Sequence, residues 1–142
     1  MIYSNTIGAC FLYTKKIANK IGEYNTNLFL VEDYDYWMRI FLNGKISAIN
    51  EVLYTYRMHS KSLTATRKEE VRKVLKEYQF SQISNFEKHK IPKLTLFRFF
   101  EHLTKYFDSE KDVNSFRKQM THRHPLYFWF RILKKIKHIF KK

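Results

Sequence analysis

The stretch Glu32-Asp33-Tyr34-Asp35-Tyr36-Trp37-Met38-Arg39 carries the pattern that decides the first part of this chain. Its apolar residues recur at helical spacing, and Gly44 follows where a glycine can end a helix, so we predict a helix over 33–43. Its three carboxylates stand at the N-terminus, where the helix dipole favours negative charge. Acidic residues at a helix N-terminus either only cap the helix or belong to a functional site. The side chains expected to face a core are Tyr36, Trp37, Ile40 and Phe41.

A second polar group follows in the segment Tyr56-Arg57-Met58-His59 and at Ser62. Carboxylates can accept a proton or bind a metal ion, histidine can ligate a metal ion, and arginine and serine can hold phosphate. Together the two groups have the chemistry to activate a hydroxyl beside a charged diphosphate.

Length and composition indicate one ordinary domain with an aromatic core. The chain has 142 residues, with 13 Phe and 10 Tyr but only 3 Gly and 2 Pro, which favours long regular elements. Its one cysteine, Cys10, excludes an internal disulfide, fits a reducing cytoplasm, and is predicted to be a small buried residue. We find no secretory signal and no apolar run of about eighteen residues that could span a bilayer.

The net charge of +14 is concentrated in one part of the chain. Residues 1–64 have 7 Lys or Arg and 5 Asp or Glu, whereas residues 65–142 have 20 and 8. The pattern also becomes helical near Ala65, so we expect two domains, 1–64 and 65–142. The basic part should meet an anionic partner, either phospholipid or nucleic acid.

The other expected elements give an α/β chain that is mostly helical. The first part should contain short strands at 9–13, 46–49 and 52–57, and a helix over 15–21 capped by Thr14 and ended by Gly22. The second part should contain helices over 66–88 and 94–107, a third helix that Ser109 caps and that ends near His122, and a last helix from Pro125 to the C-terminus. A capping box, Thr66-Arg67-Lys68-Glu69, should start the first of these helices.

Six short motifs follow one another over residues 1–64. They are Ile7-Gly8-Ala9-Cys10, Ile21-Gly22-Glu23-Tyr24, Asn27-Leu28-Phe29, Glu32 to Arg39, Leu53-Tyr54-x-Tyr56-Arg57-x-His59, and Ser62-Leu63-Thr64. Their order and spacing resemble the C-terminal half of the catalytic domain of family 2 glycosyltransferases, which have the GT-A fold. The resemblance implies an incomplete GT-A half-domain, followed by the variable helical tail that such enzymes often carry.

The resemblance also implies roles for individual residues. Asp33, preceded by Glu32, resembles the general base that takes the proton of the acceptor hydroxyl. His59 resembles a ligand of the divalent metal, Mn or Mg, or of the donor diphosphate. The implied substrate-binding residues are Gly8 and Ala9 beside the donor sugar, Asp35, Trp37 and Arg39 near the acceptor pocket, and Arg57 and Ser62 near the diphosphate.

The chain departs from the family pattern, because the nucleotide-binding half and its Asp-x-Asp metal motif at a strand end are missing. Asp33-Tyr34-Asp35 has that spacing but opens a helix, so we favour the general base over a metal site here. We therefore expect a fragment, from a split gene, a truncated frame or a cut protein. It should be inactive alone, with a separate chain as one source of the missing half.

The segment 125–142 is amphipathic and has no acidic residue. This pattern is typical of a helix in the interface of an anionic membrane, and it predicts a peripheral protein on the cytoplasmic face. The alternative is a helix packed on its own domain with a solvated basic side. The nearby His122-x-His124 is a poor zinc motif, because no further ligand accompanies it. The apolar side of the helix contains Trp129, Ile132, Leu133, Ile136, Ile139 and Phe140.

Three functions stay open at this point. The first is the acceptor-side part of an enzyme that transfers sugar from a nucleotide-sugar donor to a polysaccharide or lipid-linked acceptor, with no nucleic-acid partner. The second is a non-catalytic basic helical module that binds an anionic membrane or nucleic acid, although no nucleic-acid motif is present. The third is a degenerate, non-catalytic remnant of such an enzyme.

Overall fold

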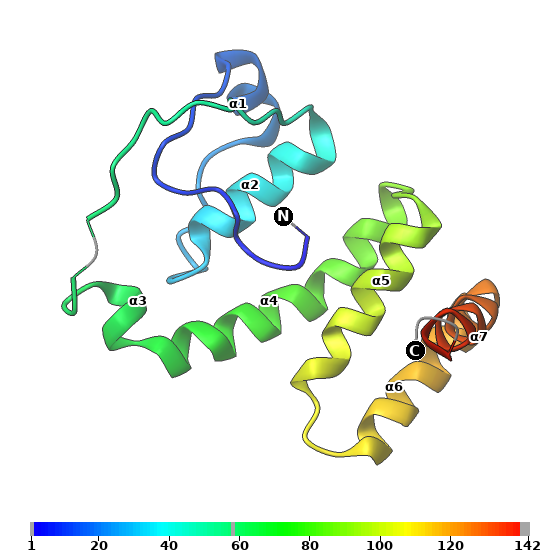
Figure 1. Ribbon diagram of the computed structural model, residues 1–142. Helices are drawn as coiled ribbons and strands as arrows, with labels where there is room; N and C mark the ends of the chain where they lie inside the picture. Colours follow the sequence, from blue (N-terminus) through cyan, green and yellow to red (C-terminus); the bar gives the residue numbers. More distant parts are fainter. Residues whose placement is uncertain (1, 58, 140–142) are drawn as a thin grey trace. The chain divides into compact units, whose positions relative to one another are not determined.

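The computed structural model describes residues 2–57 and 59–139, and within them it contains helices and no strand (Figure 1). The mostly helical character expected from the sequence is confirmed. The elements are α1 (Lys15–Ile21), α2 (Glu32–Asn43), α3 (Leu63–Thr66), α4 (Lys68–Lys88), α5 (Lys93–Leu103), the 3₁₀ helix η1 (Thr104–Tyr106), α6 (Glu110–Arg123) and α7 (Leu126–Ile139).

The three strands expected at 9–13, 46–49 and 52–57 are not formed. These segments are irregular, and Leu12 and Val52 within them are 98% and 96% exposed. A strand needs a neighbour for its backbone groups, and the described residues provide no such partner. Cys10, which was expected to be buried, is exposed because it lies in the first of these segments.

The chain divides into two compact units, one from the N-terminus to Gln82 and one from Ile83 onward. The division falls inside α4, so this helix contributes to both units. The domain boundary near Ala65 rests on a change of sequence pattern and stays a prediction.

In the first unit, α1 and α2 pack together around buried side chains of α2. Tyr36, Trp37 and Ile40 form this cluster, and half-buried isoleucines of α1 and of the preceding segment cover it. Phe41 is 36% exposed, so its predicted core position is wrong. It lies next to Ile40 in sequence but on the flank of the helix, about 100° further round the axis.

Two helix caps predicted from the sequence are present. Thr14 Oγ1 accepts a hydrogen bond from Ile17 N at 3.3 Å, and Ser109 Oγ accepts one from Asp112 N at 3.1 Å. Gly22 ends α1 with φ of 78°, a conformation that favours glycine. These ends depend only on neighbouring residues, which is why the sequence locates them well.

The capping box expected at Thr66 is not formed. Ser62 caps the single turn of α3 instead, accepting a hydrogen bond from Ala65 N at 3.3 Å. The Thr66 hydroxyl donates to Ser62 O at 3.0 Å. Thr66 is the last residue of α3, and α4 begins only at Lys68, so Arg67 and not Thr66 directly precedes the helix.

The second unit is a helical bundle with an aromatic core. Phe86 of α4, Phe99 and Phe100 of α5, and Tyr127 of α7 are each 0% exposed. The Phe86 and Phe99 rings meet edge to face, with centroids 4.9 Å apart. The helix predicted over 94–107 is thus present as α5 and contributes to the core of this unit.

Glu101 joins three helices of this second unit. Arg117 of α6 donates to both of its carboxylate oxygens, at 3.2 and 2.9 Å, and the Tyr127 hydroxyl and Lys134 Nζ of α7 donate as well. Burial alone would raise the pKa of Glu101, but the hydrogen bonds from Arg117 and Tyr127 outweigh it and hold the pKa below its usual value. The ionised carboxylate therefore fixes α7 against α5 and α6.

Candidate functional site

Asp33 lies in the first turn of α2 with a partly exposed carboxylate. Its Oδ1 accepts a hydrogen bond from Tyr34 N at 2.6 Å, and its Oδ2 accepts one from Asn5 Nδ2 at 2.8 Å. These bonds orient the carboxylate without using all of its acceptor capacity. Glu32 precedes it, and Leu30 just before has φ of 75°, a strained conformation of the kind often retained at functional sites.

Asp35 and Arg39 are engaged inside the first unit. Asp35 is 8% exposed, and its carboxylate accepts hydrogen bonds from Arg39 Nε at 2.8 Å and from the Tyr78 hydroxyl at 3.1 Å. Burial and the charge of Asp35 raise the pKa of Tyr78, so its hydroxyl stays protonated and keeps donating. Arg39 also donates to the carbonyls of Ile21 and Glu23, at 2.6 and 2.9 Å. The pair thus ties α1, α2 and α4 together, and its role in an acceptor pocket stays a prediction.

Trp37 belongs to the core of the first unit and is 3% exposed. Its ring meets the edge of Phe11 with centroids 4.3 Å apart, and Tyr13 lies 6.2 Å away. It therefore supports α2 from the side opposite to solvent. Contact between Trp37 and an acceptor stays a prediction.

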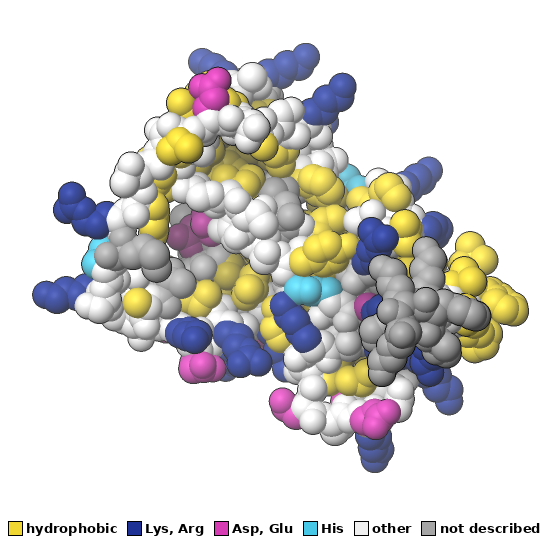
Figure 2. Space-filling model, viewed as in Figure 1, with side chains coloured by type: hydrophobic (Ala, Val, Ile, Leu, Met, Phe, Trp, Pro, Cys, Tyr) yellow, Lys and Arg dark blue, Asp and Glu magenta, His cyan; other side chains and the backbone are white. Residues whose placement is uncertain are grey.

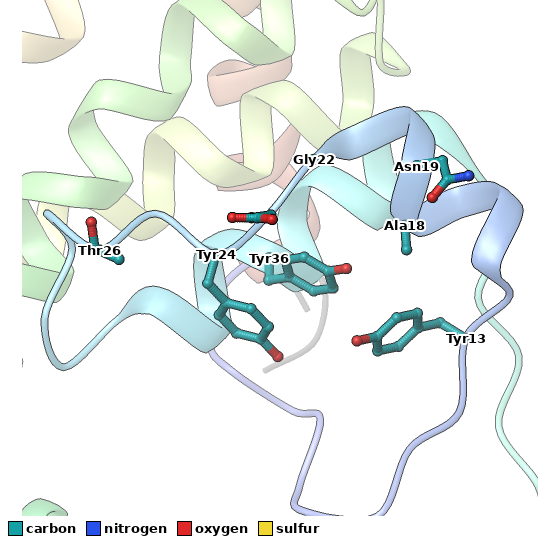
Figure 3. Close-up of a pocket in the computed structure, with 8 residues that line it drawn as sticks. Tyr13, Ala18, Asn19, Gly22, Tyr24, Thr26 and Tyr36 are labelled. Atoms are coloured by element: carbon teal, nitrogen blue, oxygen red, sulfur yellow. The ribbon is translucent and has the colours of Figure 1, made fainter.

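An open cavity of about 560 Å³ lies beside α1 and α2 (Figure 3). Tyr24 and Tyr36 stack there with centroids 4.3 Å and planes 1° apart, and Tyr13 lies 5.5 Å from Tyr36. Figure 3 shows these rings gathered together, with Asn19 and Thr26 at opposite ends. Aromatic walls with a few polar groups are typical of small-molecule sites. The other lining residues are Ala18, Gly22 and Glu23.

Two tyrosine hydroxyls of this cavity have raised pKa values. The pKa of the Tyr24 hydroxyl is raised first by burial, then by Tyr13 and by the charges of Asp33 and Glu32. Burial and a hydrogen bond with Tyr13 raise the pKa of Tyr36 as well. These hydroxyls stay protonated at neutral pH and can donate to a ligand.

The second group of predicted residues does not join the acidic residues of α2. Arg57 and His59 are exposed on the segment that leads to α3, and Ser62 is the cap of that helix. In the part of the chain that the structure describes, no hydrogen bond or ion pair links these three to α2. Gly8 and Ala9 are also exposed, and a Cβ added at Gly8 would meet nothing within 4 Å. Their roles toward a donor stay predictions.

Two further expectations concern metals and membranes. Within residues 2–57 and 59–139, no three His, Cys, Asp or Glu side chains come together to hold a metal ion. His124 of the weak zinc motif lies instead with its Nε2 2.7 Å from a Glu87 carboxylate oxygen. None of the helices in the described ranges has the length and apolar character needed to cross a membrane.

The residues that hold the two aspartates in place were not predicted from the sequence. Asn5 is 28 positions from Asp33, and Tyr78 is 43 positions from Asp35. Local spacing contains no signal for such contacts. The cavity was also missed, although the tyrosine that ends the Ile21-Gly22-Glu23-Tyr24 motif could have suggested it.

No protein-family model, curated protein or solved structure matches this chain. The candidate site therefore rests on its residues and their geometry, and the resemblance to family 2 glycosyltransferases stays a hypothesis.

Proposed function

We propose that this chain is the acceptor-side part of a GT-A glycosyltransferase, which moves a sugar from a nucleotide-sugar donor to a hydroxyl of a glycan or lipid-linked acceptor. The position of Asp33 supports this most. Its carboxylate is partly exposed and oriented by Asn5, and it belongs to the same unit as the tyrosine cavity. Removal of a hydroxyl proton requires an accessible carboxylate of this kind.

In the proposed reaction, Asp33 accepts the proton of the acceptor hydroxyl. The hydroxyl oxygen forms the new bond to the anomeric carbon of the donor sugar. The bond from that carbon to the diphosphate oxygen breaks, and the nucleoside diphosphate leaves with the electron pair. Positive charge near the diphosphate favours its departure, and Arg57, His59 and Ser62 are the residues proposed to lie there.

The expected divalent ion, Mn or Mg, would neutralise the diphosphate in a complete enzyme. The described residues of this chain do not assemble a ligand set, so His59 could supply at most one ligand. We assign no step of the reaction to the ion. Its other ligands would come from the nucleotide-binding half, provided by a separate chain or by another part of the polypeptide.

The tyrosine cavity is the proposed place for the acceptor sugar. Tyr13 and Tyr24 are 38% and 39% exposed, so their rings can offer apolar faces to the C–H side of a sugar. Asn19, Glu23 and Thr26 line the same cavity and can bind sugar hydroxyls. Asp33 would then meet the one hydroxyl that reacts.

The chain alone is expected to transfer no sugar, because we assign none of its described residues to the nucleotide of the donor. The measurement is turnover of labelled nucleotide-sugars by the pure chain. Turnover that Asp33→Asn abolishes would show that no second half is needed.

The general base is tested in the complete enzyme, formed by co-expression with a nucleotide-binding half. Asp33→Asn should lower kcat by about a hundredfold to ten-thousandfold, with the KM for the donor little changed. The matched control is Asp112→Asn, an acid in the first turn of α6 in the second unit. Near-normal turnover of Asp33→Asn would make the base assignment wrong.

A further inference from the structure

Three large apolar side chains of α7 point out of the second unit, and we name them the outward stripe. Trp129, Leu133 and Ile136 are 61%, 60% and 42% exposed. They share one side of the helix, because they follow each other at spacings of four and three residues. Leu126 and Phe128, which are 62% and 47% exposed, flank the stripe. Figure 2 shows hydrophobic side chains gathered beside the position that α7 has in Figure 1.

The opposite side of α7 is fixed to the unit by Glu101. The Tyr127 hydroxyl donates to Glu101, Lys134 Nζ donates to it at 3.2 Å, and Arg131 Nε lies 3.9 Å away. The Tyr127 ring is 0% exposed and lies 5.5 Å from the Phe97 ring. Since Tyr127, Arg131 and Lys134 share one helix side, these contacts turn the outward stripe away from the core.

The outward stripe is more apolar surface than an ordinary surface helix exposes. A surface helix of a globular protein buries its apolar side and exposes its charged side. In α7 the packed side contains the rings of Tyr127 and Phe130, which lie 5.5 and 5.7 Å from the Phe97 ring, whereas the outward stripe meets solvent. α7 therefore packs one apolar side on its own unit and leaves a second apolar side exposed. A contiguous apolar patch that stays exposed indicates a surface for a partner or a membrane.

We propose that α7 lies in the headgroup region of an anionic membrane, with the outward stripe inserted and nearby lysines on the lipid phosphates. The positive charge of the C-terminal segment favours an anionic membrane as the partner of this surface. Residues 125–142 contain Arg131, Lys134, Lys135, Lys137, Lys141 and Lys142 and no acidic residue. Lys135 is exposed on α7 itself. Large aromatic and aliphatic residues beside lysines are typical of helices in this interface.

A second copy of this chain is a poorer occupant of the same surface. Two copies of α7 meeting through the outward stripe would bring like positive charges together, which opposes association. Nucleic acid would meet the cations but would leave the outward stripe in water. The membrane inference does not depend on sugar transfer, and it places the protein peripherally on the cytoplasmic face, whose lipids are anionic.

The first experiment measures pelleting of the full chain with vesicles. Binding is expected to phosphatidylcholine vesicles that contain phosphatidylglycerol, to be weak without the anionic lipid, and to fall with salt, because exposed charges are screened over about 10 Å at 0.1 M. The combined variant Trp129→Gln, Leu133→Gln and Ile136→Gln should bind at least about tenfold more weakly.

A matched control replaces three exposed apolar residues of the first unit by glutamine. Leu12, Val52 and Leu53 are 98%, 96% and 60% exposed, and their replacement should leave vesicle binding unchanged. Helix content by circular dichroism should be unchanged in both triple variants, because no replaced side chain is buried.

Tryptophan fluorescence gives an independent readout in the intact chain. Trp129 lies in the outward stripe, whereas Trp37 is 3% exposed in the first unit. Anionic vesicles should shift the Trp129 emission to the blue, and brominated lipid should quench it, with the Trp37 emission unchanged. The variants Trp37→Phe and Trp129→Phe assign the two signals.

Equal pelleting of both triple variants would overturn the proposal, and so would binding that is indifferent to lipid charge. Self-association that the outward-stripe variant loses, without vesicle binding, would identify a second copy as the occupant instead. Retention on duplex DNA without retention on vesicles would assign the positive charge to nucleic acid.

Discussion

In the first unit the aromatic residues Tyr13 and Tyr24 remain partly exposed around a cavity, whereas in the second unit Phe99 and Phe100 are sealed between helices. The second unit consists of helices, which satisfy their own backbone hydrogen bonds and need only side-chain packing. The first unit also contains long irregular segments, such as 45–57, whose backbone meets solvent.

The second unit therefore has the features of a stable core, and the first unit has the groups suited to chemistry. The second unit has a dense core and a satisfied ionic cluster at Glu101, both of which favour a rigid body. The first unit has the open cavity, the partly exposed Asp33 and exposed apolar segments. Loosely packed regions with exposed functional groups are where binding and catalysis are usually found.

The largest expected effect is on the core of the second unit. Phe100→Ala removes a ring that is 0% exposed and should destabilise this unit by about 3–5 kcal/mol. Hydrogen exchange resolved by peptide should show lost protection in α5, α6 and α7 but retained protection in α1 and α2. Phe128→Ala, at a 47% exposed position, is the control. Equal loss in both units would mean that they unfold as one.

Arg39→Ala tests the ionic cluster of the first unit. The change leaves the buried Asp35 without its charged partner and removes the bonds to Ile21 O and Glu23 O. We expect the free energy of unfolding to fall by about 1.5–3 kcal/mol. Urea unfolding, monitored by Trp37 fluorescence, measures this loss. Arg67→Ala is the matched control.

The control pair, Arg67 with Glu70, is about half exposed on both sides and should contribute less than about 1 kcal/mol. If both variants have the same stability, the Asp35–Arg39 pair does not organise the first unit.

Acid should weaken the second unit. Burial, helped by the charge of Lys105, lowers the pKa of His102 to about 4. The unfolded chain binds this proton near pH 6.5, so the stability that neutral His102 provides is complete above about 6.5 and is lost progressively toward pH 4. The low pKa of Glu101 adds a further loss at still lower pH.

The measurement is the melting temperature as a function of pH, with His102→Gln as the comparison. The variant should show a flatter profile between about pH 6.5 and 4. An unchanged profile would rule out His102 as the source of acid sensitivity.

The smallest expected effect is on the irregular segments of the first unit. Leu12→Gln and Val52→Gln change side chains that are 98% and 96% exposed, and each should alter stability by less than about 0.5 kcal/mol. Urea unfolding checks this. A loss of several times that size would show that these segments are buried in solution, as the predicted strands would be.

Helix boundaries were predicted best and strands worst, for one physical reason. A strand is completed by backbone hydrogen bonds to a segment elsewhere in the chain. The sequence of 46–49 could not show that the described residues provide no such segment. The same reason separates the residues of the candidate site that were predicted from those that were not. The sequence predicted Asp33 at a helix N-terminus, but Asn5, which orients its carboxylate, could not be predicted.

The sequence by itself determined the positions of α1, α2 and α6, because their ends depend on contacts a few residues long, such as Thr14 to Ile17 and Ser109 to Asp112. It also determined that α7 is amphipathic. Only the tertiary structure decided which side of α7 faces outward, because that depends on Glu101, 26 positions before Tyr127. The tyrosine cavity was decided in the same way, since separate segments bring its rings together.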